Sequence, residues 1–176
     1  MAKLTTLVKR AKKGDSEAFI ALIQQYEDVL YKVASRLLTK DEDVADAMQD
    51  AILAAYEKLE SLQNDAYFNT WICKILINKC HRILNRNKAV FDVVEIENLQ
   101  DGVHDSTLKM ELEDELNVLN NDYKTAIVLY YIVGMNTKEI SEFLKEPEGT
   151  IKSRLSRAKS ILRSNHHKSE DVIGYV

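Results

Sequence analysis

The chain has 176 residues, of which 45% are apolar and 30% charged, so its composition is that of a globular protein and not of a disordered one. Five Gly and one Pro are too few for the turns that a sheet protein of this length needs, which predicts an all-α fold. Two Cys cannot form a disulfide framework and are typical of a reducing compartment. We read no membrane span and no signal peptide, and we expect a cytoplasmic protein.

The net charge of −4 is distributed unevenly along the chain. Residues 1–87 carry a net charge of +1, residues 88–122 carry −8 and residues 123–176 carry +3. Two stretches contain no acidic residue: residues 66–88 hold five Lys or Arg, and residues 149–169 hold six. Two acid-free basic stretches predict a nucleic-acid binder whose overall charge conceals its contact surfaces.

Hydrophobic periodicity predicts two small helical domains joined by an acidic linker. The predicted boundaries are residues 1–87 for the N-terminal domain, 88–110 for the linker, 111–168 for the C-terminal domain and 169–176 for a tail. The linker lacks sustained helical periodicity, and the polar residues from Asn165 onward are expected to fray.

Capping signals and breaks divide the N-terminal domain. Asp15 and Ser16 are candidate caps after a glycine, and the Thr39-Lys-Asp-Glu sequence resembles a capping box. Residues 61–67 interrupt the helical pattern and are predicted to form a loop. A long helix is then expected from about Phe68 into the late eighties.

The C-terminal domain is predicted to contain a helix-turn-helix. Helical segments at residues 123–133, 138–144 and 150–164 are separated by short turns. Asn136 lies three residues before Glu139, which is the spacing of a capping box. Pro147 forbids simple continuation of the middle helix and suits the start of the next one. A short helix, a tight turn and a following helix is the arrangement that places its second helix in a major groove of DNA.

The last helix has an apolar stripe and a polar face on a wheel of about 100° per residue. Ile151, Leu155, Ala158 and Leu162 form the stripe, which predicts core packing. The opposite face carries hydroxyl and basic side chains suited to base edges and phosphates: Lys152, Ser153, Ser156, Arg157, Lys159, Ser160 and Arg163. Arg154 falls to one side, where a phosphate contact is expected. The alternative is a solvated basic face, which the absence of any acid in this stretch disfavours.

The long helix after Phe68 carries a second polar and positive stripe. Its members recur at helical spacing: Lys74, Asn78, His81, Arg82 and Asn85. Trp71 lies at the head of this stripe, and aromatic side chains beside basic ones suit a surface that holds unstacked bases. The alternative for Phe68 and Trp71 is packing in the core.

Several of these segments resemble bacterial sigma factors of the extracytoplasmic-function class of the sigma-70 family. Residues 149–159, Gly-Thr-Ile-Lys-Ser-Arg-Leu-Ser-Arg-Ala-Lys, resemble that family's recognition helix. Residues 129–134, Leu-Tyr-Tyr-Ile-Val-Gly, resemble the run into its promoter-reading helix-turn-helix. The Asp15-Ser-Glu-Ala-Phe, Asp46-Ala-Met-Gln-Asp and Phe68-Asn-Thr-Trp-Ile sequences resemble its other domain.

The resemblance implies a role for each set of residues. The last helix, from Lys152 to Arg163, would read the minus-35 element. The minus-10 element would be read and melted by Asn64, Trp71, Lys74, Asn78 and Arg82. Asn64, in the loop, is the best candidate for capturing a flipped base, because hydrogen bonds to a base edge become available once the base leaves the stack. Docking on the polymerase clamp would involve Asp46, Gln49 and Asp50, which share one helical face. The sequence departs from the family pattern at Ala51 and Ile52, where a bulkier pair is common.

The expected function is therefore that of an alternative sigma factor, which binds core RNA polymerase and promoter DNA. No catalytic constellation, cofactor site or small-molecule substrate is predicted, and the spacing of Cys73, Cys80 and His81 matches no standard zinc site. The alternatives are a stand-alone transcriptional regulator and a protein-interaction module. The resemblance also implies an anti-sigma factor, which in this class is often membrane-anchored. The acidic linker could run through a basic channel of the polymerase, mask the DNA-binding helices or serve solubility.

Overall fold

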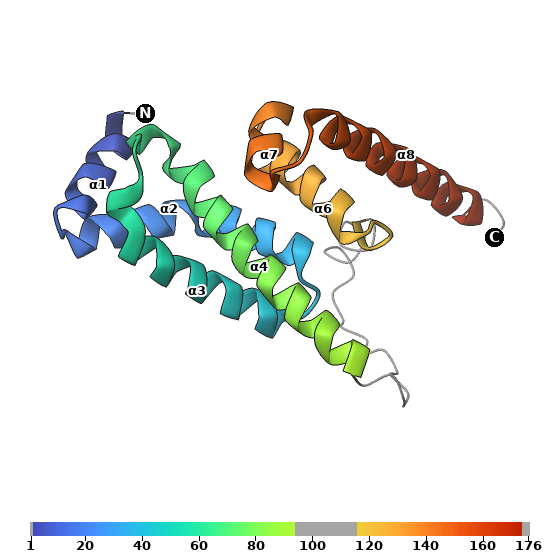
Figure 1. Cartoon of the computed structure of the whole chain (residues 1–176), viewed down its shortest axis with the longest axis horizontal. Helices are drawn as coiled ribbons and strands as arrows, with labels where there is room; N and C mark the ends of the chain where they lie inside the picture. Colours follow the sequence, from blue (N-terminus) through green and yellow to red (C-terminus); the bar gives the residue numbers. More distant parts are fainter. Residues whose placement is uncertain (1, 94–115, 174–176) are drawn as a thin grey trace. The chain divides into compact units, whose positions relative to one another are not determined.

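The computed structural model describes residues 2–93 and 116–173, and every regular element in these ranges is helical. This confirms the predicted all-α fold for the described part of the chain. The elements fall into two units, one ending at Val93 and one that contains α6, α7 and α8 (Figure 1). The division into two helical domains is as expected.

The N-terminal unit consists of four helices and two short 3₁₀ turns. The elements are α1 (Ala2–Lys12), α2 (Ser16–Leu37), α3 (Asp41–Lys58), η1 (Leu59–Ser61), η2 (Asp65–Tyr67) and α4 (Phe68–Val93). α4 packs against both α2 and α3, and α1 packs against α2 (Figure 1). Phe68, Leu22, Leu30, Ile72 and Leu76 are completely buried where these helices meet. These side chains form a core between α2 and α4, and the buried Val44, Ala47, Ala51 and Ala55 attach α3 to the same unit.

The starts of α2 and α3 differ in how they are capped. Asp15 accepts a hydrogen bond from the backbone N–H of Ala18 at 3.0 Å, so the predicted cap is confirmed. The predicted capping box at residues 39–42 is wrong, because α3 begins at Asp41 and the cap position is held by Lys40. An ammonium group cannot accept a hydrogen bond.

The interval predicted as a loop, residues 61–67, begins at the last residue of η1 and ends with η2. The side-chain oxygen of Asn64 accepts from the backbone N–H of Ala66 at 3.1 Å and so caps η2. The ammonium of Lys12 donates to the carbonyl of Leu62 at 2.5 Å and to Oδ1 of Asp65 at 2.6 Å. α1 thus ties this interval to the rest of the unit.

The C-terminal unit contains α6 (Asn121–Ile127), a π-helical turn η3 (Val128–Ile132), α7 (Thr137–Leu144) and α8 (Glu148–Ile173). α8 packs against both α6 and α7. The capping box of α7 is confirmed: Asn136 Oδ1 accepts from Glu139 N at 3.0 Å, and Glu139 Oε2 accepts from Asn136 N at 2.8 Å. The turn before α7 requires φ +81° at Gly134, a conformation that glycine adopts without strain. The predicted helix-turn-helix is present.

Two helices extend beyond their predicted ends. α4 continues to Val93, so residues 88–93 are helical and do not belong to a linker. α8 continues to Ile173, past the expected end near Ser164 and into the predicted tail. Neither extension contains Gly or Pro, so nothing in the local sequence stops the helix. Residues 94–110 of the predicted linker lie outside the described residues.

Candidate nucleic-acid interface

α8 turns its apolar stripe into the C-terminal unit and its polar residues outward. Ile151 and Ala158 are fully buried, Leu155 is nearly so, and Leu162 is half-buried. Of the α8 residues predicted to contact DNA, all except Arg154 are exposed: Lys152, Ser153, Ser156, Arg157, Lys159, Ser160 and Arg163. The apolar stripe is thus confirmed, and the contact with the minus-35 element stays a prediction.

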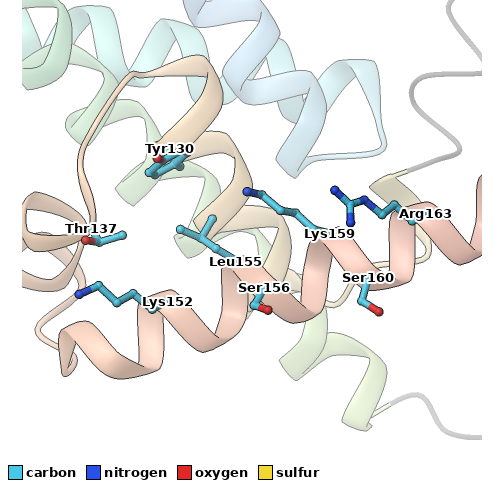
Figure 2. A pocket seen from close by; sticks show the side chains of 8 residues that line it. All are labelled: Tyr130, Thr137, Lys152, Leu155, Ser156, Lys159, Ser160 and Arg163. Carbon is cyan, nitrogen blue, oxygen red and sulfur yellow. The ribbon is translucent and has the colours of Figure 1, made fainter.

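The exposed residues of α8 divide into two faces. At about 100° per residue, Lys152, Lys159 and Arg163 lie on one side of the helix, and Ser153 and Arg157 lie on another. The first side faces a hollow of about 430 Å³. Its lining comes from three elements: Tyr130, Thr137, Lys152, Leu155, Ser156, Lys159, Ser160 and Arg163 (Figure 2). We call the second side, with Ser153 and Arg157, the reading face. Neither residue lines the hollow, and Ser160 lies at the border between the two faces.

Tyr130 lines the hollow and Tyr131 packs against Tyr130, and neither was among the predicted site residues. Tyr130 is 39% exposed and Tyr131 is 54% exposed, and their ring centroids are 4.9 Å apart in an edge-to-face arrangement. The Lys159 Nζ atom lies 5.5 Å from the centroid of the Tyr131 ring, within the range of a cation–π contact. Both tyrosines belong to η3, and π-helical turns occur frequently at functional sites. Two consecutive tyrosines directly before the helix-turn-helix were the available signal.

A hydrogen-bonded chain joins the N-terminal ends of α7 and α8. The hydroxyl of Thr137 donates to Glu148 Oε1 at 2.6 Å, and Lys152 Nζ lies 2.9 Å from the same oxygen. The Thr137 hydrogen bond, and then the hydrogen bond and charge of Lys152, hold the pKa of Glu148 below its usual range. Lys152 therefore reaches the hollow already oriented by a carboxylate of its own helix.

The side chain of Arg154 makes contacts that the sequence did not predict. Its side chain is 17% exposed, with NH1 2.6 Å from Glu146 Oε2 and NH2 2.9 Å from Asp122 Oδ2. Asp122 belongs to the first turn of α6, and Glu146 belongs to the turn between α7 and α8. The expected phosphate contact of Arg154 has no support in this geometry, because the guanidinium is engaged by two carboxylates of its own domain.

Four of the five predicted minus-10 residues lie on α4, starting in its first turn. Trp71 is half-buried, with its ring centroid 5.9 Å from that of the buried Phe68. Further along the helix, Lys74 is half-buried, and Asn78 and Arg82 are exposed. Core packing thus holds for Phe68, whereas Trp71 is at the boundary of core and surface.

Asn64 and Tyr67 stand just before this helix. Asn64 is exposed, and its side-chain oxygen is used in capping η2, so its amide NH₂ is the group left for an outside acceptor. Tyr67 is 58% exposed and was not among the predicted residues. The amide of Asn64 and the rings of Tyr67 and Trp71 therefore all lie within eight residues at the start of α4.

The predicted polymerase-docking residues share one exposed face of α3. Asp46, Gln49 and Asp50 are all exposed. The same face continues one turn on with Leu53, which is 59% exposed and was missed. Acidic groups followed by an apolar side chain suit a basic partner surface with a hydrophobic recess.

Comparisons with known proteins match both units. The model of Sigma-70 region 2 matches residues 22–90, and that of Sigma-70, region 4 matches residues 109–162. The chain is 31% identical over 173 residues to the ECF RNA polymerase sigma factor SigW of Bacillus subtilis, covering 89% of this chain and 92% of that protein. It is 30% identical over 176 residues to the ECF RNA polymerase sigma-E factor of Escherichia coli K12, covering 89% and 90%. The chain belongs to the extracytoplasmic-function sigma factors.

Two solved structures share the fold. A sigma factor RpoE from Bartonella quintana, solved in complex with the anti-sigma factor NepR, matches with a TM-score of 0.66 and 25% identity over 82% of this chain and 95% of its own. CnrH, solved in complex with the cytosolic domain of CnrY, matches with a TM-score of 0.69 and 24% identity over 94% and 98%.

The sigma factor is a transcription initiation factor and not an enzyme. Its region 2 contains the predicted minus-10 and docking residues, and its region 4 contains α8 up to residue 162 and all the residues that line the hollow except Arg163. Burial raises the pKa of the Cys73 and Cys80 thiols to about 12, so both are unreactive core residues. Within the described ranges, no cluster of three or more metal-ligating side chains occurs and no helix is long and apolar enough to cross a membrane.

Proposed function

We propose that this sigma factor holds its promoters by two contacts, one from each domain, and acts in the cytoplasm. α4 and the Asn64 turn engage the minus-10 element, and α8 engages the minus-35 element. The observation that carries the proposal is the exposed basic and hydroxyl side chains of α8 between residues 152 and 163, on a helix-turn-helix. Because the two domains are linked, the first contact raises the effective concentration of the second.

On α8 we assign different roles to the two faces. Arg157 and Ser153, on the reading face, reach base edges. Lys152, Lys159 and Arg163 border the hollow beside Thr137, at the N-terminal end of α7, and hold the sugar-phosphate backbone. Their positive charge favours phosphates, and Lys152 shares its charge with the Glu148 carboxylate, which also accepts from Thr137 at the N-terminal end of α7. Backbone contacts of this kind position a protein, and base contacts specify the sequence.

The test is promoter selection by the holoenzyme. The chain is added to core RNA polymerase, and transcripts are collected from a library in which both promoter elements are randomised. Enrichment of one minus-10 and one minus-35 sequence supports the proposal. Transcription that needs only one element, or no enrichment with a holoenzyme that has formed, contradicts two-contact recognition.

We also propose that an anti-sigma factor holds this protein inactive. The support is the relative RpoE, which was solved in complex with NepR. The inhibitor would contact both the Asp46–Asp50 face of α3 and the Lys152–Arg163 face of α8, because blocking one domain leaves the other able to engage. A purified inhibitor should then displace core polymerase and minus-35 DNA alike. Displacement of one ligand only would contradict contact with both faces.

A further inference from the structure

Arg154 lies on the recognition helix and yet points away from both exposed faces. Around the helix axis it is about 60° from Ile151, on the side opposite the hollow. Its two guanidinium nitrogens pair with different elements, NH2 with Asp122 at 2.9 Å and NH1 with Glu146 at 2.6 Å. One side chain thus joins α6, the turn before α8 and α8 itself.

The turn that supplies Glu146 is fixed by its own hydrogen bonds. Glu146 N donates to the carbonyl of Ser141 at 3.1 Å, and the Ser141 hydroxyl donates to the carbonyl of Glu146 at 2.5 Å. The Glu146 side chain is 32% exposed. Its carboxylate is therefore presented to Arg154 from a rigid support, and a fork-shaped guanidinium can bind two carboxylates at once.

We propose that Arg154 is a positioning residue, which fixes the orientation of α8 in the domain and contacts no phosphate. Moving the guanidinium to DNA would break both ion pairs and leave the partly buried Glu146 without its partner, which is costly. The proposal deepens the proposed function, since it rests on α8 being the helix that enters DNA. A recognition helix must be held within a fraction of an ångström to place Arg157 on a base edge.

The two roles predict opposite effects for the carboxylates. If Arg154 contacted phosphate, Asp122→Asn and Glu146→Gln would release it and remove negative charge, so DNA binding would become tighter. If Arg154 positions α8, the same variants loosen the helix and binding becomes weaker. The same loss of negative charge acts in both cases, so weaker binding shows that the loss of positioning outweighs it and separates the two roles.

The experiment uses the full chain, free and in holoenzyme, with the duplex that wild-type holoenzyme selects. We expect Arg154→Ala to lower affinity about tenfold, a loss of about 1.4 kcal/mol, with an unchanged slope of log affinity against log salt. Arg154→Lys keeps the charge but not the fork, so it should not restore binding. Hydrogen exchange in the free chain should become faster in α8 and in the first turn of α6.

Arg157→Ala is the matched control, because Arg157 is exposed on the same helix. It should alter sequence preference and leave exchange in α8 unchanged. The proposal is overturned if Arg154→Ala flattens the salt slope by about one ion, if the carboxylate variants bind more tightly, or if exchange in α8 is unaffected. Should wild-type holoenzyme select no promoter, the proposed function fails, and hydrogen exchange still decides whether Arg154 fixes α8.

Discussion

The ammonium of Lys79 on α4 lies 3.2 Å from Oδ2 of Asp50 on α3. One of the carboxylates predicted to dock on polymerase is therefore already paired inside the protein. Asp50 itself is 65% exposed, so the pair is screened by solvent and contributes at most about 1 kcal/mol to the free energy of unfolding. Asp50 is free to exchange this intramolecular lysine for a cation of a partner at little cost.

Charge reversal on α3 tests the docking surface. We expect Asp46→Lys/Asp50→Lys to lower affinity for core polymerase at least about tenfold, because like charges would then face a basic surface. The free energy of unfolding should change little, since both side chains are exposed. Affinity is measured by titrating labelled sigma factor with core enzyme.

Lys79→Ala is the control for that variant. It breaks the same ion pair and leaves both carboxylates in place. Polymerase affinity should be unchanged or slightly higher, because Asp50 no longer has a competing partner. Equal losses in Lys79→Ala and in the double variant would mean that α3–α4 packing, and not the carboxylates, governs docking.

The two faces of α8 should respond differently to alanine. Arg157→Ala is expected to cost ~1–3 kcal/mol on the preferred minus-35 sequence and to relax selection at one position. Lys159→Ala should weaken binding to all sequences evenly and reduce the salt slope by about one ion. Both are measured with randomised minus-35 duplexes at several salt concentrations. A relaxed preference in Lys159→Ala with full preference in Arg157→Ala would reverse the assignment of faces.

Asn64 can be tested without disturbing its turn. Asn64→Ser keeps an oxygen that can accept from Ala66 N and removes the amide NH₂. If that NH₂ binds a flipped base, promoter opening should slow by up to about tenfold, the worth of one hydrogen bond. Opening is followed by permanganate reactivity of the melted strand, and polymerase binding should be unaffected. Promoter opening at the wild-type rate in Asn64→Ser would contradict a contact between the Asn64 amide and a flipped base.

Glu148 should make the C-terminal domain sensitive to acid. Its pKa is below the ordinary value of 4.5, so its contribution to stability is complete above about that pH and is lost as the pH falls through the lowered pKa. In Glu148→Gln, stability should fall less steeply with decreasing pH, and the side-chain amide oxygen can still accept from Thr137. Thermal midpoints from about pH 7 to about pH 3, with Glu142→Gln as the control on α7, provide the measurement. An identical acid profile in Glu148→Gln and wild type would contradict the role of this carboxylate.

Lys145 ends α7 in a conformation that suits glycine. Its φ is +57° and its ψ is +41°, in the left-handed region. Replacing it with glycine relieves the clash of Cβ with the backbone, so Lys145→Gly should raise the free energy of unfolding by about 0.5–1 kcal/mol. Chemical denaturation measures the change. Lys145→Ala, which keeps a Cβ, serves as control and should bring no such gain.

Sequence periodicity was sufficient to predict features that lie within a single helix, such as apolar stripes and caps. The stripe of Ile151, Leu155 and Ala158, the cap at Asp15 and the box of Asn136 with Glu139 all follow from spacing along the chain, and the structure confirms each. The division into two helical domains also followed from periodicity, and the family models assign the domains to regions 2 and 4. α4 extends past its predicted end because a lack of sustained periodicity was taken as the start of a linker, and α8 because polar composition was taken as a sign of fraying. Neither segment holds a helix breaker.

What the sequence did not predict depends on residues far apart in the chain. The ion pairs of Arg154 could not be predicted, because its angle on the wheel says nothing of Asp122, 32 residues away, or of the turn that brings Glu146 to it. The hollow likewise needs Tyr130 from η3 opposite α8. Pairing across elements is set by tertiary packing, which a helical wheel does not contain.

The π-helical turn η3 also affects how relatives of this protein should be compared. A π turn accommodates one residue more than an α-helix of the same length. A relative that lacks that residue would rotate the preceding helix by about 100° relative to the helix-turn-helix. It could keep both tyrosines in an alignment and still turn them away from the hollow. Whether a relative has the same aromatic side chain beside the hollow therefore depends on the number of residues that align with 128–132 as much as on their identity.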